Sequence, residues 1–130
     1  MDESLHLGLW LDAGSRVRGL PDQLRRHIDL VRVAESRGFE SVWVGETHSF
    51  GMPAPFQWLA ALAPQTSLRL GIGVLLLPAW HPLRLAVEAS ILDGLSGGRF
   101  ELGVGVGRRP LQLRFGVEPA TVATYADEVL

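Results

Sequence analysis

Cysteine and lysine are both absent from this chain of 130 residues. Without cysteine, the chain cannot form disulfides, ligate an iron–sulfur cluster, use a thiolate nucleophile or bind zinc through sulfur. Without lysine, it cannot form a Schiff base or a lysine-containing phosphate loop, and all twelve of its basic residues are arginine. The lack of cysteine is compatible with a reducing compartment, and we expect a cytoplasmic protein.

Other features that the sequence has little of exclude further classes of partner. The net charge is −2, so there is no basic excess to bind a nucleic-acid backbone. The apolar run 70–77 is too short to span a bilayer, and the acidic start MDESLHLGLW does not resemble a secretory signal. With 47% apolar residues the composition fits one modest soluble domain over residues 1–130. No metal site is predicted, because close metal-ligand spacing is lacking among the four histidines, His6, His27, His48 and His81.

The stretch 68–109 predicts a strand, a helix and a second strand. Residues 68–77 are almost continuously apolar, as in a strand covered on both faces. Pro82 suits the first position of a helix, and Gly97-Gly98 suits its end. Residues 100–106 read as the second strand, so the two strands should be parallel with a right-handed crossover. One face of this helix is predicted to carry Leu83, Ala86, Val87 and Ser90.

The rest of the chain shows the same alternation. The other expected elements are a strand over 5–11, a helix over 21–37, a strand over 41–44, a helix over 56–63, a loop over 108–119 and a short helix over 120–130. The helix over 21–37 should bury Leu24, Ile28, Val31 and Ala34, with Gly38 as its left-handed cap. Four such units predict a (β/α)8 barrel or an open doubly wound sheet. The dinucleotide pattern G-x-G-x-x-G does not occur.

Three segments carry a family resemblance: VWVGETHSF, the long segment LRLGIGVLLLPAWHPLRLAVEASILDGLSGGRFELGVGVG, and the later RFGV. Together they resemble the bacterial-luciferase-like superfamily, whose members are flavin-dependent monooxygenases and coenzyme F420-dependent oxidoreductases. The resemblance implies an α/β fold made of the first four βα units of a (β/α)8 TIM barrel, with parallel strands. A whole barrel needs roughly 250 residues, so the chain looks like an amino-terminal half.

The resemblance also implies a site for FMN or coenzyme F420. In several family members a non-prolyl cis peptide at the position of Gly73-Val74 lies against the flavin ring. The cofactor-binding residues at the end of the last strand would be Gly105, Val106, Gly107 and Arg108, near the ribityl and phosphate groups. The alternatives are a strand glycine packed against a neighbouring side chain and an ordinary surface pair, Arg108 and Arg109.

The candidate catalytic residues are Glu46 and His48, which follow the second strand. Luciferase-type members often read Glu-His-His here, and this chain has Thr47 at the central position. His48 could act as an acid or base, with a locally hydrogen-bonded loop histidine as the alternative. His81 is expected to fix the start of a helix. Tryptophans could stack on a ligand, but Trp10 and Trp43 are expected in the core.

Two classes of function remain open. The first is a luciferase-like flavin- or F420-dependent oxidoreductase, a monooxygenase or a hydride-transfer enzyme that acts on a small molecule. The second is a catalytically inactive half-barrel that acts through self-association or by pairing with a complementary half. We expect a homo-oligomer or such a pair, because four strands leave the two edges of the sheet open.

Overall fold

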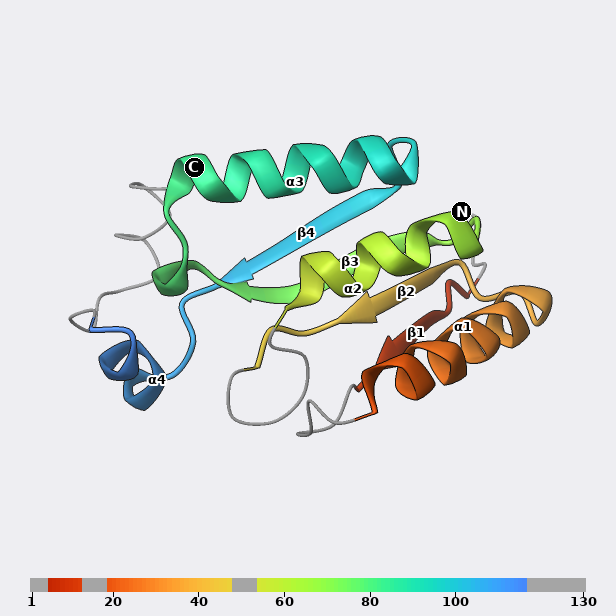
Figure 1. Cartoon of the computed structure of the whole chain (residues 1–130), viewed down its shortest axis with the longest axis horizontal. Helices are drawn as coiled ribbons and strands as arrows, with labels where there is room; N and C mark the ends of the chain where they lie inside the picture. Colours follow the sequence, from red (N-terminus) through yellow and green to blue (C-terminus); the bar gives the residue numbers. More distant parts are fainter. Residues whose placement is uncertain (1–4, 13–18, 48–53, 117–130) are drawn as a thin grey trace.

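The computed structural model describes residues 5–12, 19–47 and 54–116 (Figure 1). Strands and helices alternate along these residues. The elements are β1 (Gly8–Leu11), α1 (Leu20–Ser36), β2 (Ser41–Val44), α2 (Pro55–Leu62), the 3₁₀ turn η1 (Ala63–Gln65), β3 (Arg69–Leu76), the 3₁₀ turn η2 (Leu77–Ala79), α3 (Pro82–Ser96), β4 (Phe100–Gly105) and α4 (Arg109–Arg114). The four strands lie in the order β1-β2-β3-β4, and every neighbouring pair is parallel. The predicted α/β fold with parallel strands in chain order is therefore confirmed.

The ends of the helices follow the predicted signals. The imidazole of His81 accepts a hydrogen bond from the Leu83 N–H at 3.2 Å, so His81 caps α3 as expected. Gly97 follows α3 with φ 68°, and Gly38 lies just beyond α1 with φ 84°. Glycine is favoured at both places because left-handed backbone is costly for residues with a Cβ atom.

One face of the sheet packs against the helices and forms the core. Fully buried strand residues such as Val42, Leu70 and Ile72 belong to one hydrophobic cluster with helix residues such as Val31 and Leu59. The predicted stripe of α1 is confirmed, since Val31 and Ala34 are buried and Leu24 and Ile28 pack against the core. Figure 1 shows α2 between α1 and α3.

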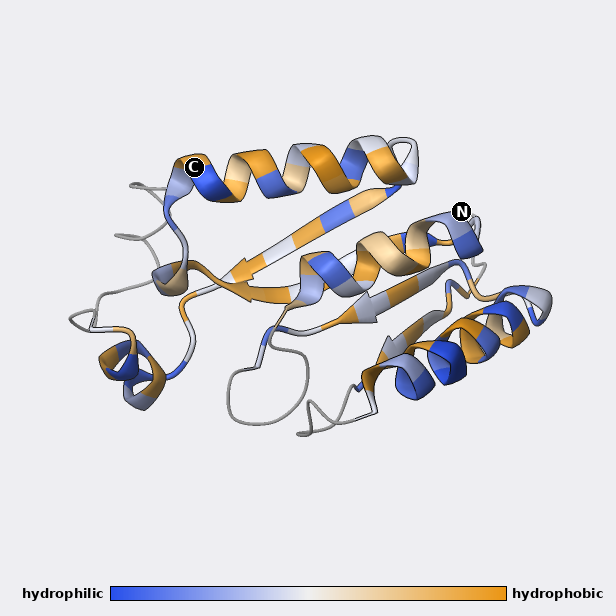
Figure 2. Cartoon of the chain, viewed as in Figure 1, coloured by the Kyte–Doolittle hydropathy of each residue, from blue (hydrophilic) through white to orange (hydrophobic). Residues whose placement is uncertain are grey.

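We call the opposite face of the sheet the open face. It carries every second residue of each strand, because strand side chains alternate between the two faces. In Figure 2 the arrow of β4 alternates between hydrophobic and hydrophilic colours along its length. The expectation that Trp10 lies in the core is wrong, because its side chain is 55% exposed. The cause is the two-residue period of a strand, which places Trp10 opposite the buried Leu11.

The segment after β4 also differs from the prediction. A loop was expected over 108–119, but Arg109–Arg114 forms the short helix α4. Pro110 suits its first turn, and the side chain of Gln112 donates to the carbonyls of Val106 at 3.0 Å and Gly107 at 3.4 Å. The helix expected over 120–130 lies outside the described residues.

No described helix combines the length and the apolar character that crossing a bilayer requires.

Candidate functional site

The carboxyl ends of the four strands lie along one edge of the sheet, because all of the strands are parallel. Asp12 follows β1, Glu46 lies just beyond β2, η2 follows β3, and Arg108 lies beyond β4. This edge therefore brings together the segments that hold the predicted site residues.

Glu46 is buried at this edge and joins two strand ends. Only 4% of its surface is exposed, and its Oε2 accepts a hydrogen bond from the Leu76 N–H at 2.7 Å. The indole N–H of Trp80 donates to both carboxylate oxygens at 3.1 Å. The backbone N–H of Glu46 donates to the Val74 carbonyl at 3.2 Å. These contacts hold Glu46, two residues beyond β2, against the end of β3 and the segment after η2.

The second predicted catalytic residue, His48, lies outside the described residues. Thr47 is partly buried directly after Glu46. The role of His48 in catalysis therefore stays a prediction, and so does that of Glu46.

The peptide bond between Gly73 and Val74 is cis, as the family resemblance leads us to expect. Val74 is 42% exposed and stands beside two glycines of β4. A Cβ atom added to Gly105 would lie 3.1 Å from Val74 Cγ2, and one added to Gly103 would lie 2.8 Å from the Ile72 carbonyl oxygen. Because glycine has no side chain, these two positions of β4 add no side chain to the surface of the sheet beside Val74.

Two tryptophans lie over glycines on the same face. A Cβ atom added to Gly71 would be only 2.1 Å from Trp43 Cε3, and one added to Gly45 would be 2.9 Å from the ring of Trp10. Trp10 pairs with Trp43 in the sheet register, and Trp43 pairs with Gly71. We call Trp10 and Trp43 the tryptophan shelf. The shelf adds a flat aromatic surface to the open face, beside Gly73 and Val74.

The end of β4 holds the other predicted cofactor residues. Gly107 has φ 69°, and a Cβ atom added to it would lie 3.2 Å from Leu76 Cδ2. Arg108 is exposed at the start of α4, where its guanidinium is accessible to an anion. Gln112, which is buried and binds the carbonyls of Val106 and Gly107, is a supporting residue that the sequence reasoning missed.

The sequence contains a signal for the shelf, although strand positions favour a place in the core for Trp10 and Trp43. Trp10 and Trp43 occupy equivalent positions in β1 and β2, and Gly71 continues that row into β3. Large aromatic residues beside a glycine in one row of a sheet indicate rings that lie flat on the backbone. Gln112 had no such signal, because its partners are backbone carbonyls.

Comparison with known proteins agrees with this architecture. Residues 5–130 match the family described as luciferase-like monooxygenase. The 4-hydroxyprotoasukamycin monooxygenase of Streptomyces nodosus subsp. asukaensis is 43% identical over 112 residues, which make up 82% of this chain and 30% of that protein.

Two solved structures show the same fold over nearly the whole chain. The oxygenating constituent of 3,6-diketocamphane monooxygenase from Pseudomonas putida, in complex with FMN, gives a TM-score of 0.82 at 25% identity. The coenzyme F420-dependent tetrahydromethanopterin reductase of Methanopyrus kandleri gives a TM-score of 0.76, also at 25% identity. Each match covers 97% of this chain and 38% of the other. The four βα units thus correspond to part of a TIM barrel, and the chain belongs to the luciferase-like monooxygenase family.

Proposed function

We propose that this chain supplies part of the cofactor site of an oxidoreductase that uses FMN or coenzyme F420. The observation that carries the proposal is a flat surface on the open face, beside the carboxyl ends of the strands, where tryptophan rings and glycines replace protruding side chains. It consists of the tryptophan shelf and of Gly73, Val74 and Gly105.

The residues present fit a planar cofactor. A Cβ atom at Gly103 would meet the Ile72 carbonyl oxygen at 2.8 Å and one at Gly105 would meet Val74 at 3.1 Å, so packing favours glycine at both positions and β4 carries no side chain there beside Val74. The exposed Arg108 lies beyond this surface and can bind a phosphate through two parallel hydrogen bonds. Gly73, Val74 and residues 105–108 are therefore the proposed cofactor-binding residues.

The bound cofactor supplies hydride transfer and, for reduced flavin, reaction with dioxygen, so the substrate would be a small molecule that is oxygenated or exchanges a hydride. The chain's own residues bind and orient that cofactor. His48 would hold or move a proton near the substrate, since imidazole titrates near neutral pH. Glu46 would line the site and hold the ends of β2 and β3 together through Leu76 and Trp80.

Titration of the purified chain with FMN and with F420, followed by cofactor fluorescence, tests the proposal. We expect saturable binding of one of them. Arg108→Gln should weaken FMN binding about tenfold, equivalent to about 1.4 kcal/mol, and should leave the binding of riboflavin, which lacks the phosphate, unchanged. Arg109→Gln is the matched control and should bind FMN as the unaltered chain does. Absence of binding at millimolar FMN and F420 would contradict the proposal.

The exposure of the open face favours a second candidate, an inactive half-barrel that pairs with a complementary half. Trp10 is 55% exposed and Val74 is 42% exposed, although both are apolar. The chain spans about 30% of the length of the curated relative described above. In a closed barrel further strands would face such residues. This candidate predicts no cofactor binding, and it predicts association that Trp10→Ser weakens in sedimentation experiments. In either role we propose a cytoplasmic location.

A further inference from the structure

Gln112 holds the turn that joins β4 to α4. Only 4% of its surface is exposed, and its side-chain amide donates to the Val106 carbonyl at 3.0 Å and to the Gly107 carbonyl at 3.4 Å. The amide nitrogen bears two hydrogens, so one glutamine can serve both acceptors. The backbone N–H of Gln112 donates to the Arg108 carbonyl at 3.1 Å. Three successive carbonyl oxygens, those of residues 106–108, therefore accept hydrogen bonds from this one residue.

These contacts set the direction of the peptide units in the turn. Gln112 is buried, whereas Gly107 and Arg108 are exposed, so the carbonyl oxygens are turned toward the inside of the molecule. The peptide bonds of the turn are trans, and in a trans peptide the N–H group points opposite to the carbonyl. The N–H groups of Gly107 and Arg108 therefore point away from Gln112.

The backbone around Gly107 supports the same arrangement. Its φ is 69°, a value that glycine adopts readily and that residues with a Cβ atom avoid. A Cβ atom added there would lie 3.2 Å from Leu76 Cδ2 and 3.6 Å from Leu111 Cδ2, so the turn packs closely against the end of β3 and against α4. The turn is thus fixed by its packing as well as by Gln112.

The direction of the carbonyls matters for the binding of an anion. A carbonyl oxygen has a partial negative charge and repels a phosphate that it faces, whereas N–H groups attract one. Gln112 turns the carbonyls away from the exposed side of the turn, where Arg108 lies. A long arginine side chain also loses conformational freedom when it binds a ligand, and a fixed backbone reduces what has to be ordered.

We propose that Gln112 is a positioning residue for the phosphate that Arg108 binds. It keeps the carbonyl oxygens of residues 106–108 away from the phosphate and fixes the backbone from which the Arg108 guanidinium extends. Because Gln112 is buried behind the turn, it acts without touching the cofactor. The inference rests on the proposed function, to which it adds a residue outside the segment 105–108.

The affinities of Gln112→Met for FMN and for riboflavin test this role. Methionine is similar in length to glutamine but cannot donate to the two carbonyls. We expect FMN binding to weaken about fivefold, as is typical of residues coupled in one contact network. Riboflavin binding should stay unchanged, because riboflavin lacks the phosphate. Equal weakening of both ligands would overturn the inference, since it would indicate a general loss of structure.

A double substitution tests whether Gln112 acts through Arg108. In a chain that already has Arg108→Gln, the further change Gln112→Met should weaken FMN binding by less than about twofold, because the interaction that it positions is already lost. Losses of affinity that simply add would contradict the positioning role, since independent residues give additive effects.

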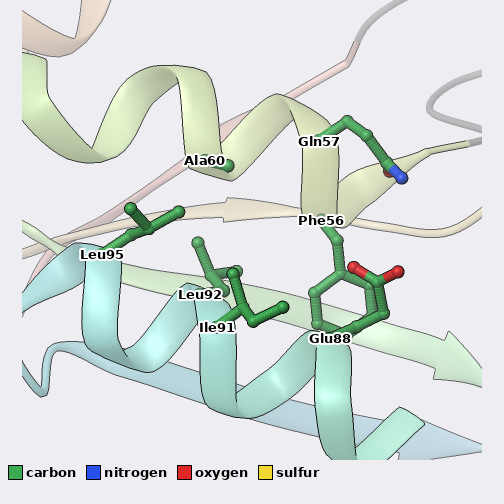
Figure 3. Close-up of a pocket in the computed structure, with 7 residues that line it drawn as sticks. All are labelled: Phe56, Gln57, Ala60, Glu88, Ile91, Leu92 and Leu95. Carbon is green, nitrogen blue, oxygen red and sulfur yellow. The ribbon is translucent and has the colours of Figure 1, made fainter. Parts of the chain in front are cut away.

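Gln57→Met is the matched control, because it makes the same replacement at an exposed glutamine. Gln57 lies on α2, where it lines a groove between α2 and α3 (Figure 3). Figure 1 shows α4 apart from both of these helices. The control chain should bind FMN and riboflavin as the unaltered chain does. A fivefold loss of FMN affinity in this control would overturn the assignment of the effect to Gln112.

Hydrogen exchange of the side-chain amides in the unaltered chain, followed by NMR, tests the contact without a substitution. We expect the amide hydrogens of Gln112 to exchange more slowly than those of the exposed Gln57, with and without FMN. Equal exchange rates would overturn the inference, because Gln112 would then not hold the turn. An unaltered chain that binds neither FMN nor F420 contradicts the proposed function and this inference together. FMN binding that Gln112→Met leaves unaltered contradicts this inference alone.

Discussion

The indole N–H of Trp58 on α2 donates a hydrogen bond of 2.9 Å to Nδ1 of His27 on α1. Both side chains are buried, and the rings meet edge to face with their centroids 5.5 Å apart. The bond requires His27 to be unprotonated at Nδ1, because an imidazolium nitrogen would present a second donor to the indole. This single contact therefore links the packing of α1 and α2 to pH.

Stability should fall when the solution is acidified through the range in which histidine titrates. Burial lowers the pKa of His27 below its ordinary value of 6.5, and nearby Arg26 lowers it further, while the backbone and carboxylate of Asp12 act in the opposite direction. The unfolded chain then takes up the proton first, so the stability present above pH 6.5 is lost as the pH falls toward the lower folded pKa.

Urea unfolding at several pH values between 8 and 5 measures this effect. In His27→Gln the amide oxygen can still accept from Trp58 but does not titrate, so the decrease should become smaller. The exposed His6 provides the control, and His6→Gln should keep the decrease due to His27. An unchanged pH dependence in His27→Gln would contradict this explanation.

Loss of the Glu46 carboxylate should destabilise the strand ends. Glu46→Ala leaves the buried Leu76 N–H and the Trp80 indole N–H without this acceptor, at a cost of about 3 kcal/mol. Glu46→Gln retains one acceptor oxygen and should cost about 1 kcal/mol. Denaturant unfolding followed by tryptophan fluorescence gives both values. Equal stabilities of the two variants would show that the hydrogen bonds of the carboxylate contribute little.

A side chain at Gly71 should displace the tryptophan shelf. The Cβ atom of Gly71→Ala would lie 2.1 Å from Trp43 Cε3, so the indole must move, and we expect a loss of about 2 kcal/mol in the free energy of unfolding. Gly94→Ala is the matched control, because its Cβ atom meets nothing within 4 Å and alanine favours the helix. Cofactor affinity should fall in Gly71→Ala and stay unchanged in Gly94→Ala. Equal affinity in both would remove the shelf from the proposed site.

Much of the fold could be predicted because the signals are local. Apolar runs, the proline at the start of α3 and the glycines at helix ends mark strands and helices within a few residues. The parallel order of the strands follows from their alternation with helices. The short helix α4 was missed because six residues are too few to show a helical period.

The details of the site depend on contacts between distant residues. Glu46 meets Leu76 and Trp80, which lie 30 and 34 residues away, and no spacing in the sequence indicates that pairing. The exposure of Trp10 could not be predicted either, because strand periodicity separates two faces without indicating which face the helices cover. For the same reason α3 shows two apolar faces, and only the structure identifies Leu85 and Leu92 as the buried one.

Hydrogen exchange of the backbone amides, with and without saturating FMN or F420, tests the proposed cofactor site most directly. We expect slower exchange over residues 71–77 and 103–108, at the ends of β3 and β4, and unchanged exchange over α1 and the outer surface of α3. Protection confined to α1 or to α3, or no protection by either saturating cofactor, would contradict the proposed cofactor site.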